Sequence, residues 1–517
     1  MKTIIINFNL LFLLLFTNDI FSQSLSSSGL VWSDEVRITA GYDDRNPQFG
    51  NRVYPTMYAL KREFLVFERY INSNQSNIMY FEFSTNGIIN STPINLTTNN
   101  SINKNVTLSY NRPMTQSDTA MKSCLVVWQS NRNGKWDLYG KKYFPALGWT
   151  DITIDDGTGD KTNPNVIFLT DSTYLIVYEK NSDIFYREIN TFRNIVSHEI
   201  NITQTPVTKE FNPVLCNLRY SNSNLCLTFE RIKPDSTKSL YFSKSEYPSV
   251  NFNNIVILDT TGDNSKAKYF NDFSSGIFNV VYEKTIQGIT KIKCIGIQMN
   301  SAIINKKVMN DSLNQTKNYT NFQFPILVDN GVNTLNSLAC MYQVIKNNRS
   351  NLIFAENAAY NFSSINDSIY IGDANAITEI TMNMGIFIPF ASFKIYGVYT
   401  KDSVNVSSLY MKSKVIYTTS VNKISNITPE NFVLNQNYPN PFNAGTKIRF
   451  AVKENNAFVN LSVYDVSGRL IKNLVNDKFN AGEYEYLYDA EGLSSGVYFY
   501  SLQSGEFSET KRMVLVK

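Results

Sequence analysis

The 517-residue chain has few of the side chains that bind transition metals or act as nucleophiles. It contains one histidine and five cysteines. His198 lies in the polar stretch "NIVSHEIN" without a histidine or cysteine nearby, and no C-x-x-C occurs. Zinc sites need such residues in close clusters, so the sequence excludes a zinc site. GxSxG, HExxH, P-loop and dinucleotide-binding motifs are also absent, and a Ser-His-Asp triad would depend entirely on His198.

The chain also lacks a strong charge of either sign. Its formal net charge is +4, and the lysines and arginines are scattered along the sequence. Binding to nucleic acid or to an anionic membrane needs a basic patch or stripe. Neither class of partner is therefore expected.

A long hydrophobic run occurs only at the N-terminus. The segment "MKTIIINFNLLFLLLFTNDIFSQS" has one early cation, an apolar core from Ile4 to Phe16, and small or polar residues at 22–24. A membrane span needs about 20 apolar residues, which exceeds this run. We predict a signal peptide over residues 1–22, cleaved after Ser22, rather than an uncut signal anchor. No other transmembrane anchor is expected.

The cysteines are too few for a disulfide framework. Cys216 and Cys226 flank the hairpin "LCNLRYSNSNLCL" and could form one disulfide across it. The alternative is that all five cysteines are small buried hydrophobic residues. The sequence leaves both possibilities open.

Aromatic and turn-forming residues, by contrast, are abundant. The chain has 31 tyrosines and 34 phenylalanines, and asparagine and threonine recur throughout. No sustained apolar pattern of helical period appears. These residues favour strands and turns, so the predicted fold class is all-β.

An internal repeat organises residues 30–425. The segments "FLVFERY", "LVVWQSN", "LIVYEKN", "CLTFERI", "NVVYEKT", "ACMYQVI" and "YGVYTKD" share an apolar run and an aromatic residue, usually followed by Glu or Gln, with 50 to 61 residues between successive aromatics. A second alternating strand follows each segment. Upstream of the segment there is usually a proline: Pro47, Pro113, Pro164, Pro213, Pro325 and Pro389.

Seven units of four antiparallel strands predict a seven-bladed β-propeller. We expect the early strand Glu35–Thr39 to pair into the seventh blade, because an open propeller would leave strand edges exposed. A pair of β-sandwiches is the alternative. The units resemble degenerate TolB-like and BNR-like propeller blades, although none carries the S-x-D-x-G-x-T-W motif of sialidase-type repeats. The resemblance implies a fold and no particular activity.

Carboxylates are expected to gather on one rim of this propeller. Glu68, Glu179, Glu230 and Glu283 recur at one repeat position, which favours a repeated structural contact over catalysis. Asp155, Asp156 and Asp160 break the repeat in "DDGTGDKTNP" and are the candidate ligands of a Ca²⁺ ion, although Asp and Gly are also ordinary turn formers. No other cofactor is expected.

One aromatic residue beside these acids has two possible roles. Trp136, in "SNRNGKWDLYG", could stack on a sugar ring or pack within a blade. We expect the turn of this hairpin to be type I′ at Asn133-Gly134.

The last 85 residues change character. The strands "KIRFAV", "FVNLSVYDV", "RLIKNLV", "EYEYLYDA", "GVYFYSLQ" and "KRMVLVK" alternate apolar and polar residues and are joined by glycine-containing turns. They predict a small immunoglobulin-like β-sandwich. Pro439 and Pro441 cannot donate ladder hydrogen bonds, so "NYPNPF" marks the start of this unit. We place a linker at 426–437 and the domain at 438–517.

This tail resembles the type A C-terminal sorting domain of the type IX secretion system of Bacteroidetes and their relatives. The resemblance rests on "NYPNPFNAGTKIRFAV", "VNLSVYDVSGRLIKNLV", "AGEYEYLYDAEGLSSGVYFYSLQSG" and "KRMVLVK". It implies export to the periplasm, outer-membrane passage directed by the domain, and surface attachment or release. By match, the recognition elements would be Pro439, Asn440, Pro441, Gly468, Gly496 and Lys511. An ordinary partner-binding module is the alternative.

The sequence therefore indicates a secreted or cell-surface protein that interacts with the type IX machinery. The preferred role of the propeller is non-catalytic binding of a polysaccharide or a surface protein. The alternative is a secreted glycan-active hydrolase that uses rim carboxylates.

Overall fold

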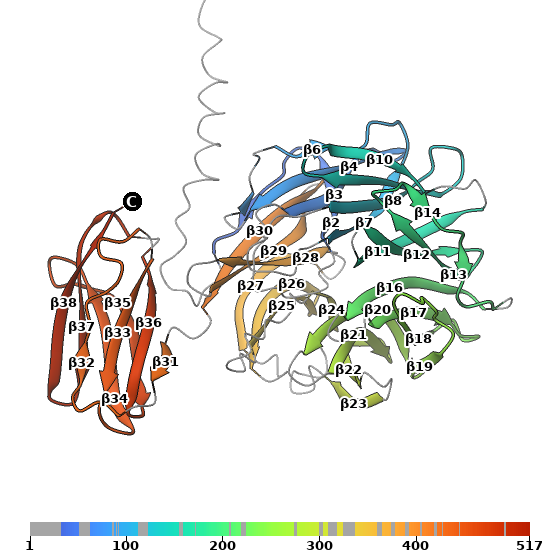
Figure 1. Cartoon of the computed structure of the whole chain (residues 1–517). Helices are drawn as coiled ribbons and strands as arrows, with labels where there is room; N and C mark the ends of the chain where they lie inside the picture. The colour runs from blue at the N-terminus through green and yellow to red at the C-terminus, as the bar shows by residue number, and fades with distance from the viewer. Residues whose placement is uncertain are drawn as a thin grey trace, which may run out of the picture. The chain divides into compact units, whose positions relative to one another are not determined.

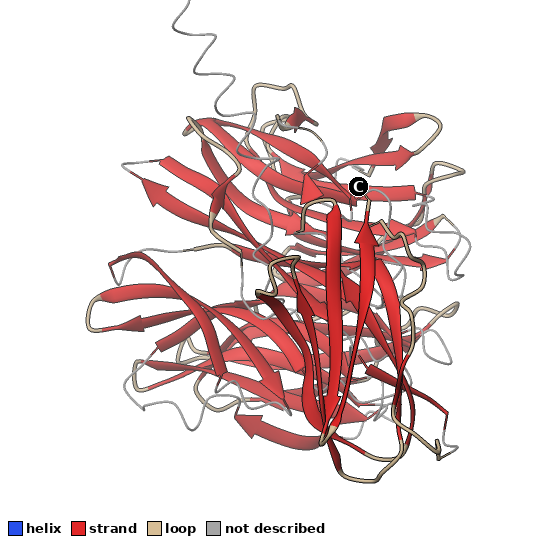
Figure 2. Cartoon of the chain, turned by 90° about the vertical axis from the view of Figure 1, so that its left-hand side faces the viewer, coloured by secondary structure: helices blue, strands red, loops and turns tan. Residues whose placement is uncertain are grey.

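The computed structural model describes most of the chain after residue 32. The described residues are 33–50, 63–84, 87–88, 90, 92–111, 123–154, 159–170, 172–205, 208–218, 224–272, 277–298, 303–308, 318–323, 337–358, 364–373, 378–387, 392–403, 406–417, 421–425, 428–443, 445–490 and 493–516. The expected signal peptide and Pro113, Pro325 and Pro389 lie outside them. Strands are the only regular elements of these ranges, as Figure 2 shows in red, so the all-β prediction is confirmed.

The chain divides into two units. The described part of the first extends to Ile386 and includes 394–414, and that of the second consists of 387, 392–393 and the residues from Val415 onward. Within the described residues, the first unit contains seven successive antiparallel sheets, which we number in chain order. The C-terminal unit contains two further sheets.

The first four sheets run without interruption along the chain. Sheet 1 consists of β2 (Asp43–Phe49), β3 (Glu63–Asn72), β4 (Gln75–Ser84), β5 (Gly87–Ile88) and β6 (Ile94–Asn95); sheet 2 of β7 (Asn103–Asn111), β8 (Ser123–Ser130), β9 (Asp137–Phe144) and β10 (Gly148–Thr153); sheet 3 of β11 (Lys161–Thr170), β12 (Thr173–Lys180), β13 (Asp183–Asn190), β14 (Ile195–Val196) and β15 (Ile200–Asn201); and sheet 4 of β16 (Glu210–Leu218), β17 (Asn224–Ile232), β18 (Lys238–Glu246) and β19 (Ile255–Asp259).

The last three sheets include one contribution from the start of the chain. Sheet 5 consists of β20 (Asp263–Asp272), β21 (Ile277–Ile286), β22 (Ile289–Gln298) and β23 (Ile303–Val308); sheet 6 of β24 (Asn318–Gln323), β25 (Ser337–Lys346), β26 (Arg349–Ala358) and β27 (Ser364–Asp373); and sheet 7 of β28 (Ile380–Phe387), β29 (Ser392–Ser403), β30 (Val406–Tyr417) and β1 (Val36–Arg37).

Strand β1 connects the beginning of the first unit to its last sheet. Val36 pairs with Met411 and Arg37 with Tyr410, and the Ile38 N–H donates to the Leu409 carbonyl at 2.8 Å. The predicted pairing of the early strand with the seventh repeat is confirmed. In Figure 1 the orange strands β28–β30 accordingly lie beside the blue strands β2–β4.

Hydrophobic cores lie between neighbouring sheets. Strand β8 is buried along its whole length, which explains why its sequence is a continuous apolar run rather than an alternating one. Leu65 and Phe67 of sheet 1 share one core with Tyr396 and Val398 of sheet 7. Sheets 1 and 7, the most distant in sequence, thus pack against each other.

The C-terminal unit consists of two four-stranded sheets around one core. One has the order β31 (Val421–Ser425), β36 (Gly482–Asp489), β33 (Gly445–Val452), β32 (Val433–Leu434); the other has the order β35 (Leu470–Phe479), β34 (Ala457–Tyr464), β37 (Gly496–Ser504), β38 (Phe507–Leu515). The six strands predicted from "KIRFAV" to "KRMVLVK" all appear. Their alternating residues, such as Ile448 and Phe450 in one sheet and Leu461 and Val463 in the other, meet in the shared core.

One strand lies on the other side of the expected domain boundary. Residues 421–425 were expected at the end of the propeller, but β31 pairs with β36 of the C-terminal unit, with Val421 opposite Tyr486. The polar sequence of this strand carries no repeat signal, and its pairing with a strand 60 residues further along the chain is a long-range contact that the local pattern does not reveal.

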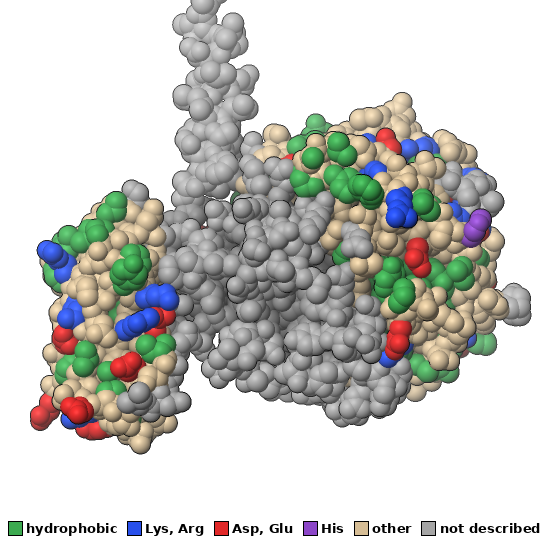
Figure 3. All heavy atoms as spheres, in the orientation of Figure 1, with side chains coloured by type: hydrophobic (Ala, Val, Ile, Leu, Met, Phe, Trp, Pro, Cys, Tyr) green, Lys and Arg blue, Asp and Glu red, His purple; other side chains and the backbone are tan. Residues whose placement is uncertain are grey.

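The described part of the chain has neither a membrane-spanning helix nor, on the face drawn in Figure 3, a surface of one charge. It contains no helix with the length and apolar character that a membrane span requires. On the face drawn in Figure 3, basic and acidic side chains are interspersed on the described surface.

Candidate functional site

The repeated glutamates join neighbouring sheets. Glu68 follows Phe67 on β3 and is 3% exposed. Its Oε1 accepts the backbone N–H of Asn105, in sheet 2, at 2.6 Å and the Nδ2–H of Asn46, in its own sheet, also at 2.6 Å. The side chain therefore connects the first strand of its own sheet to the first strand of the next one.

The same two contacts recur at the next three joints. In each, the Oε1 atom of the residue after the aromatic accepts a backbone N–H from the following sheet and an asparagine Nδ2–H from its own sheet. The acceptors and their donors are Gln129 with Asn163 N (2.8 Å) and Asn105 Nδ2 (2.8 Å), Glu179 with Asn212 N (2.8 Å) and Asn163 Nδ2 (2.6 Å), and Glu230 with Lys266 N (2.9 Å) and Asn212 Nδ2 (3.2 Å).

The donor asparagines occupy bulges in the first strand of each sheet. Asn46, Asn105, Asn163 and Asn212 have φ values of 49°, 54°, 49° and 52°, and the pairing register shifts at each position. Asparagine is one of the few residues that adopts this left-handed conformation readily. Because a bulge removes the N–H from the ladder, the group is available to the neighbouring sheet. These asparagines were not among the predicted residues, although the Asn-Pro dipeptides at 46–47, 163–164 and 212–213 were a signal.

The joint from sheet 7 to sheet 1 uses a different residue. Thr400 follows the aromatic Tyr399 here, and the backbone N–H of Asn46 donates instead to the Oε2 of Glu379, just before β28. The Thr400 Oγ1 accepts the Glu379 N–H at 2.8 Å and holds that residue in place. Asn46 consequently contacts two carboxylates, Glu379 through its backbone and Glu68 through its side chain.

Burial changes the acidity of these carboxyl groups. It raises the pKa of Glu68 to about 7, and the neighbouring Glu379 adds to the shift, whereas the hydrogen bonds from Asn46 and Tyr70 oppose it. Burial also raises the pKa of Glu230 to about 7. The prediction that the repeated glutamates satisfy the same neighbour contact is confirmed at Glu68, Glu179 and Glu230. These acids are engaged with the backbone of the next sheet.

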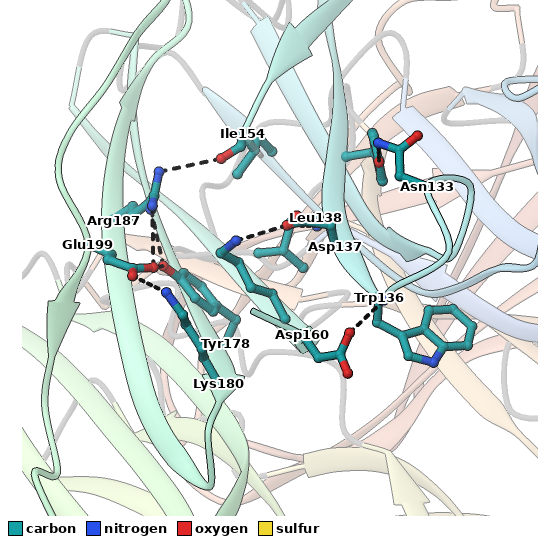
Figure 4. Close-up of polar contacts among 12 residues, drawn as sticks. Asn133, Trp136, Asp137, Leu138, Ile154, Asp160, Tyr178, Lys180, Arg187 and Glu199 are labelled. Carbon is teal, nitrogen blue, oxygen red and sulfur yellow. Dashed lines mark hydrogen bonds and ion pairs between the residues drawn. The ribbon is translucent and has the colours of Figure 1, made fainter. Parts of the chain in front are cut away.

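A second repeated cluster joins an acid to the cation two residues after the aromatic in five of the seven repeats, and Figure 4 shows the one at Tyr178. Glu199 accepts the Tyr178 hydroxyl at 2.9 Å, pairs with Lys180, and accepts Arg187 Nη2 at 3.3 Å. Tyr282 and Lys284 contact Asp259 in the same way, at 2.7 and 2.6 Å. Tyr399 and Lys401 share Glu35.

Sheets with phenylalanine in place of the tyrosine use arginine instead of lysine. Arg69 pairs with Asp44 and Arg231 with Glu210, each at 2.7 Å. Phenylalanine has no hydroxyl to donate, so the arginine, with several donors of its own, supplies the hydrogen bonds to the acid. In both forms of the repeat a cation pairs with an acid, but Arg69 and Arg231 pair with the residue opposite them on the first strand of their own sheet.

The predicted Ca²⁺ ligands are only partly described. Asp155 and Asp156 lie outside the described residues, and Asp160 is exposed, with its Oδ1 accepting the Trp136 backbone N–H at 2.9 Å. Figure 4 shows this contact together with the neighbouring buried pair, in which Lys161 Nζ lies 3.1 Å from Asp137 Oδ1. Among the described residues, no group of three His, Cys, Asp or Glu side chains could hold a metal ion.

The loop around Trp136 differs from the expected turn. Gly134 alone of the pair Asn133-Gly134 has a positive φ, 81°, and its N–H donates to the Asn131 carbonyl. The type I′ prediction is wrong because six residues separate β8 from β9, whereas that turn joins strands through two. The Trp136 ring is half-buried, with Lys104 Nζ 4.5 Å from its centre.

The segment Asn435–Phe442 ties together the two sheets of the C-terminal unit. The Tyr438 and Lys447 backbones exchange two hydrogen bonds of 2.9 Å on the β33 side. On the β38 side, Asn440 Oδ1 accepts the Val514 N–H at 2.9 Å, and the Phe442 N–H donates to the Val514 carbonyl at 2.9 Å. The two prolines lie between these contacts, so they remove no ladder hydrogen bond.

Asparagine and tyrosine side chains fix this segment from inside. The Tyr500 hydroxyl accepts the Asn437 N–H at 2.7 Å and donates to the Asn435 carbonyl at 2.8 Å. Asn437 is buried and donates to the Thr446 hydroxyl at 3.0 Å. Tyr438, in contrast, is 77% exposed, and the three residues that follow it are exposed as well.

The remaining predicted recognition residues lie at other places in this unit. Gly468, with φ 80°, is in an exposed turn closed onto Asp465. Gly496 begins β37 opposite Leu515. Lys511 on β38 pairs with Glu509 at 2.9 Å. Of the six predicted residues, Pro439, Asn440 and Pro441 are brought together, and Asn440 reaches β38, the strand that carries Lys511.

Comparison with known families identifies the C-terminal unit. Residues 436–517 match the family model of the secretion system C-terminal sorting domain. This finding confirms the resemblance to the type IX sorting domain and supports secretion by that system to the cell surface or the extracellular space. It also implies contact with the secretion machinery. No curated protein matches the chain in sequence.

Solved structures similar to the chain are β-propeller-like enzymes at low identity. They include an α-L-arabinanase of Penicillium chrysogenum complexed with arabinobiose (11% identity, TM-score 0.36, covering 57% of this chain and 90% of that one). The catalytic domain of an α-L-arabinofuranosidase of Coprinopsis cinerea has 10% identity and a TM-score of 0.30, over 57% and 87% of the two chains. The hemagglutinin-neuraminidase ectodomain of parainfluenza virus 5 has 11% identity and a TM-score of 0.32, over 79% and 95%. These scores carry no argument about activity.

Proposed function

We propose that the chain is an exported binding protein, in which a seven-bladed β-propeller is the cargo and the C-terminal β-sandwich directs it through the type IX system. The seven successive sheets, with β1 completing the seventh, support the propeller. The match of residues 436–517 to the sorting-domain family carries the export route.

The propeller is proposed to bind a polysaccharide or a surface protein without catalysis. The observation that supports this role is the engagement of the repeated glutamates. Glu68, Glu179 and Glu230 are acceptors for backbone groups of the next sheet, whereas a glycosidase needs two carboxyl groups that face the sugar.

The recognition elements of the sorting domain are proposed to be Pro439, Asn440, Pro441, Gly468, Gly496 and Lys511. The exposed segment that starts at Tyr438 offers the machinery a surface held in one conformation, because Asn437 and Asn440 fix both of its ends. Expression of the full chain in a type IX-competent host tests the route. The chain is expected outside the outer membrane, and a chain that ends at residue 435 is expected to remain in the periplasm.

The binding role is tested with the exported protein on a panel of immobilised polysaccharides. Retention and release of reducing ends are measured on the same samples. Retention without release supports the proposal. Release that disappears when Asp155, Asp156 or Asp160 is changed would instead establish the glycan-active hydrolase.

A Ca²⁺ ion at Asp155, Asp156 and Asp160 remains part of the proposal. Carboxylate oxygens are suitable ligands for this cation, and Asp160 is accessible on the surface. Calorimetric titration with CaCl₂ is expected to show binding by the wild-type chain and none by the Asp156→Asn variant. Equal heats for the two chains would remove the site.

A further inference from the structure

Two cysteines lie directly opposite each other in sheet 4. Cys216 on β16 pairs in register with Cys226 on β17. Residues that face each other in an antiparallel pair have Cα atoms about 4.5–5.5 Å apart, which falls within the range of roughly 4.4–6.8 Å seen for disulfides. Both are thiols in the structure.

The two side chains also occupy the same face of the sheet. Cys226 is fully buried in the core between sheets 4 and 5, and Cys216 packs against this core while keeping partial exposure. Both side chains therefore lie against the same hydrophobic core.

Other described cysteines have no such partner position. Cys340 on β25 pairs in register with Ala355. Cys124 on β8 faces Tyr110 and Tyr143. Cys294 on β22 faces Val281 and Lys307, and its thiol donates to Asn279 Oδ1 at 3.5 Å. The geometry thus selects one pair.

We propose that Cys216 and Cys226 form a disulfide bond in the exported protein. The signal peptide and the sorting domain direct the chain to an oxidising compartment, where disulfides persist. The inference needs only export from the cytoplasm, so it does not depend on the type IX route or on the binding role.

The oxidant that we propose for the two thiols is a molecule or protein that carries a disulfide bond. The thiolate of Cys216 attacks one sulfur of the oxidant, whose S–S bond breaks, and a mixed disulfide forms. The Cys226 thiolate then displaces the oxidant from this intermediate. The protein gains one S–S bond and loses two electrons and two protons, and the oxidant leaves as a dithiol or as two thiols.

The reaction is expected to precede burial of the hairpin. Burial raises the pKa of the Cys216 thiol to about 12, and since the thiolate is the attacking species, the folded reduced chain reacts slowly. Oxidised glutathione added during refolding should therefore form the bond faster than the same reagent added after folding.

The experiment uses the purified full chain, reduced and refolded in a mixture of oxidised and reduced glutathione. The product is labelled with N-ethylmaleimide in denaturant without reductant, digested and analysed by mass spectrometry. Three of the five cysteines are expected to be labelled, and one cross-linked peptide pair should contain Cys216 and Cys226. Labelling of all five, a glutathione adduct at either residue, or a bridge to another cysteine would overturn the proposal.

Matched variants separate the bond from the residues. Cys216→Ser is expected to expose Cys226 to labelling, whereas Cys124→Ser should leave the cross-linked peptide intact. Reductant should lower the melting temperature of the oxidised wild-type chain by several degrees and leave that of Cys216→Ser unchanged. An equal effect of reductant on both chains would contradict a stabilising bridge.

Discussion

The Oε1 atom of Glu68 accepts the backbone N–H of Asn105 at 2.6 Å, across the joint between the first and second sheets. The same oxygen accepts the side-chain amide of Asn46. One buried carboxylate thus satisfies two donors from different sheets. An unsatisfied buried donor costs about 1–3 kcal/mol, so these joints make a substantial contribution to the stability of the first unit.

Removal of this acceptor should destabilise the first unit. Glu68→Ala leaves the Asn105 N–H and the Asn46 amide without their acceptor, and we expect a loss of about 2–5 kcal/mol from the two groups and the cavity together. Glu68→Gln should cost less, because Gln129 makes the same contacts in sheet 2. Thermal unfolding of the three chains measures the order, and a Gln variant as unstable as the Ala variant would contradict it.

The buried carboxyl groups also predict a dependence of stability on pH. The pKa values of Glu68 and Glu230 are raised to about 7 in the folded state, so folding favours their protonated forms. Their stabilising contribution is complete below the unfolded pKa of about 4.5 and is lost as the pH rises through 7.

This contribution can be isolated with a double variant. A shift from about 4.5 to about 7 corresponds to roughly 3 kcal/mol per carboxyl group. Between pH 5 and pH 8, the free energy of unfolding of the wild-type chain should therefore fall relative to that of Glu68→Gln/Glu230→Gln. Parallel pH profiles for the two chains would show that neither glutamate titrates in this range.

Replacing the buried acid Asp259 by its neutral amide should lower the stability of the protein more than the same change at a surface acid. Asp259 has its pKa lowered to about 2, although burial opposes the shift, because Lys284 and Tyr282 donate to it. Asp259→Asn leaves the Lys284 ammonium buried without its counter-ion, and such a change costs about 3–5 kcal/mol. Glu454→Gln, which breaks the exposed pair with Lys453, should cost less than about 1 kcal/mol.

The pH dependence of this contact has the opposite sign to that of Glu68. Because the folded pKa of Asp259 is depressed, its stabilising effect is present above the unfolded pKa and is lost as the pH falls through about 2. Denaturation at pH 7 therefore provides the comparison of the two variants. Equal destabilisation by Asp259→Asn and Glu454→Gln would argue against a buried ion pair.

Substitution of two asparagines in the C-terminal unit should distinguish recognition by the secretion machinery from stability of the unit. Asn440 is exposed and makes two contacts with β38, so Asn440→Ala should lower the stability of this unit by only about 1 kcal/mol but reduce the exported fraction several-fold. Asn437 is buried, and Asn437→Ala should lower the melting temperature more. Export and melting temperature are measured on both chains. Unimpaired export of Asn440→Ala would exclude a recognition role for its side chain.

The sequence predicted the strands and their grouping well where the pattern repeats. The apolar run and its aromatic residue mark the second strand because both faces of such a strand are buried, as in β8 and β12. The six strands of the C-terminal unit were equally clear, because one face of each is buried and the other is exposed. The role of β1 followed from the need to cover a strand edge.

Other features could not be predicted because they break the repeat or depend on distant partners. Thr400 occupies the glutamate position in sheet 7, and its contact is made by Glu379, a residue just before β28. Strand β31 pairs with β36 although its sequence resembles neither unit. Three of the four asparagine bulges were detectable from their Asn-Pro dipeptides. Their contacts could not be predicted, because each bulge bonds to a residue of a neighbouring sheet.

The bulged asparagines have a consequence for how the number of sheets in the first unit can change. In sheets 2 to 4, the N–H of a bulged asparagine donates to the Glu or Gln of the preceding sheet. The Glu or Gln of the same sheet accepts a backbone N–H from the following sheet. Each of these sheets thus offers the same kind of donor to the sheet before it and the same kind of acceptor to the sheet after it. Duplication or loss of one whole repeat in this stretch would leave every remaining joint with a matching donor and acceptor, whereas a break inside a repeat would not.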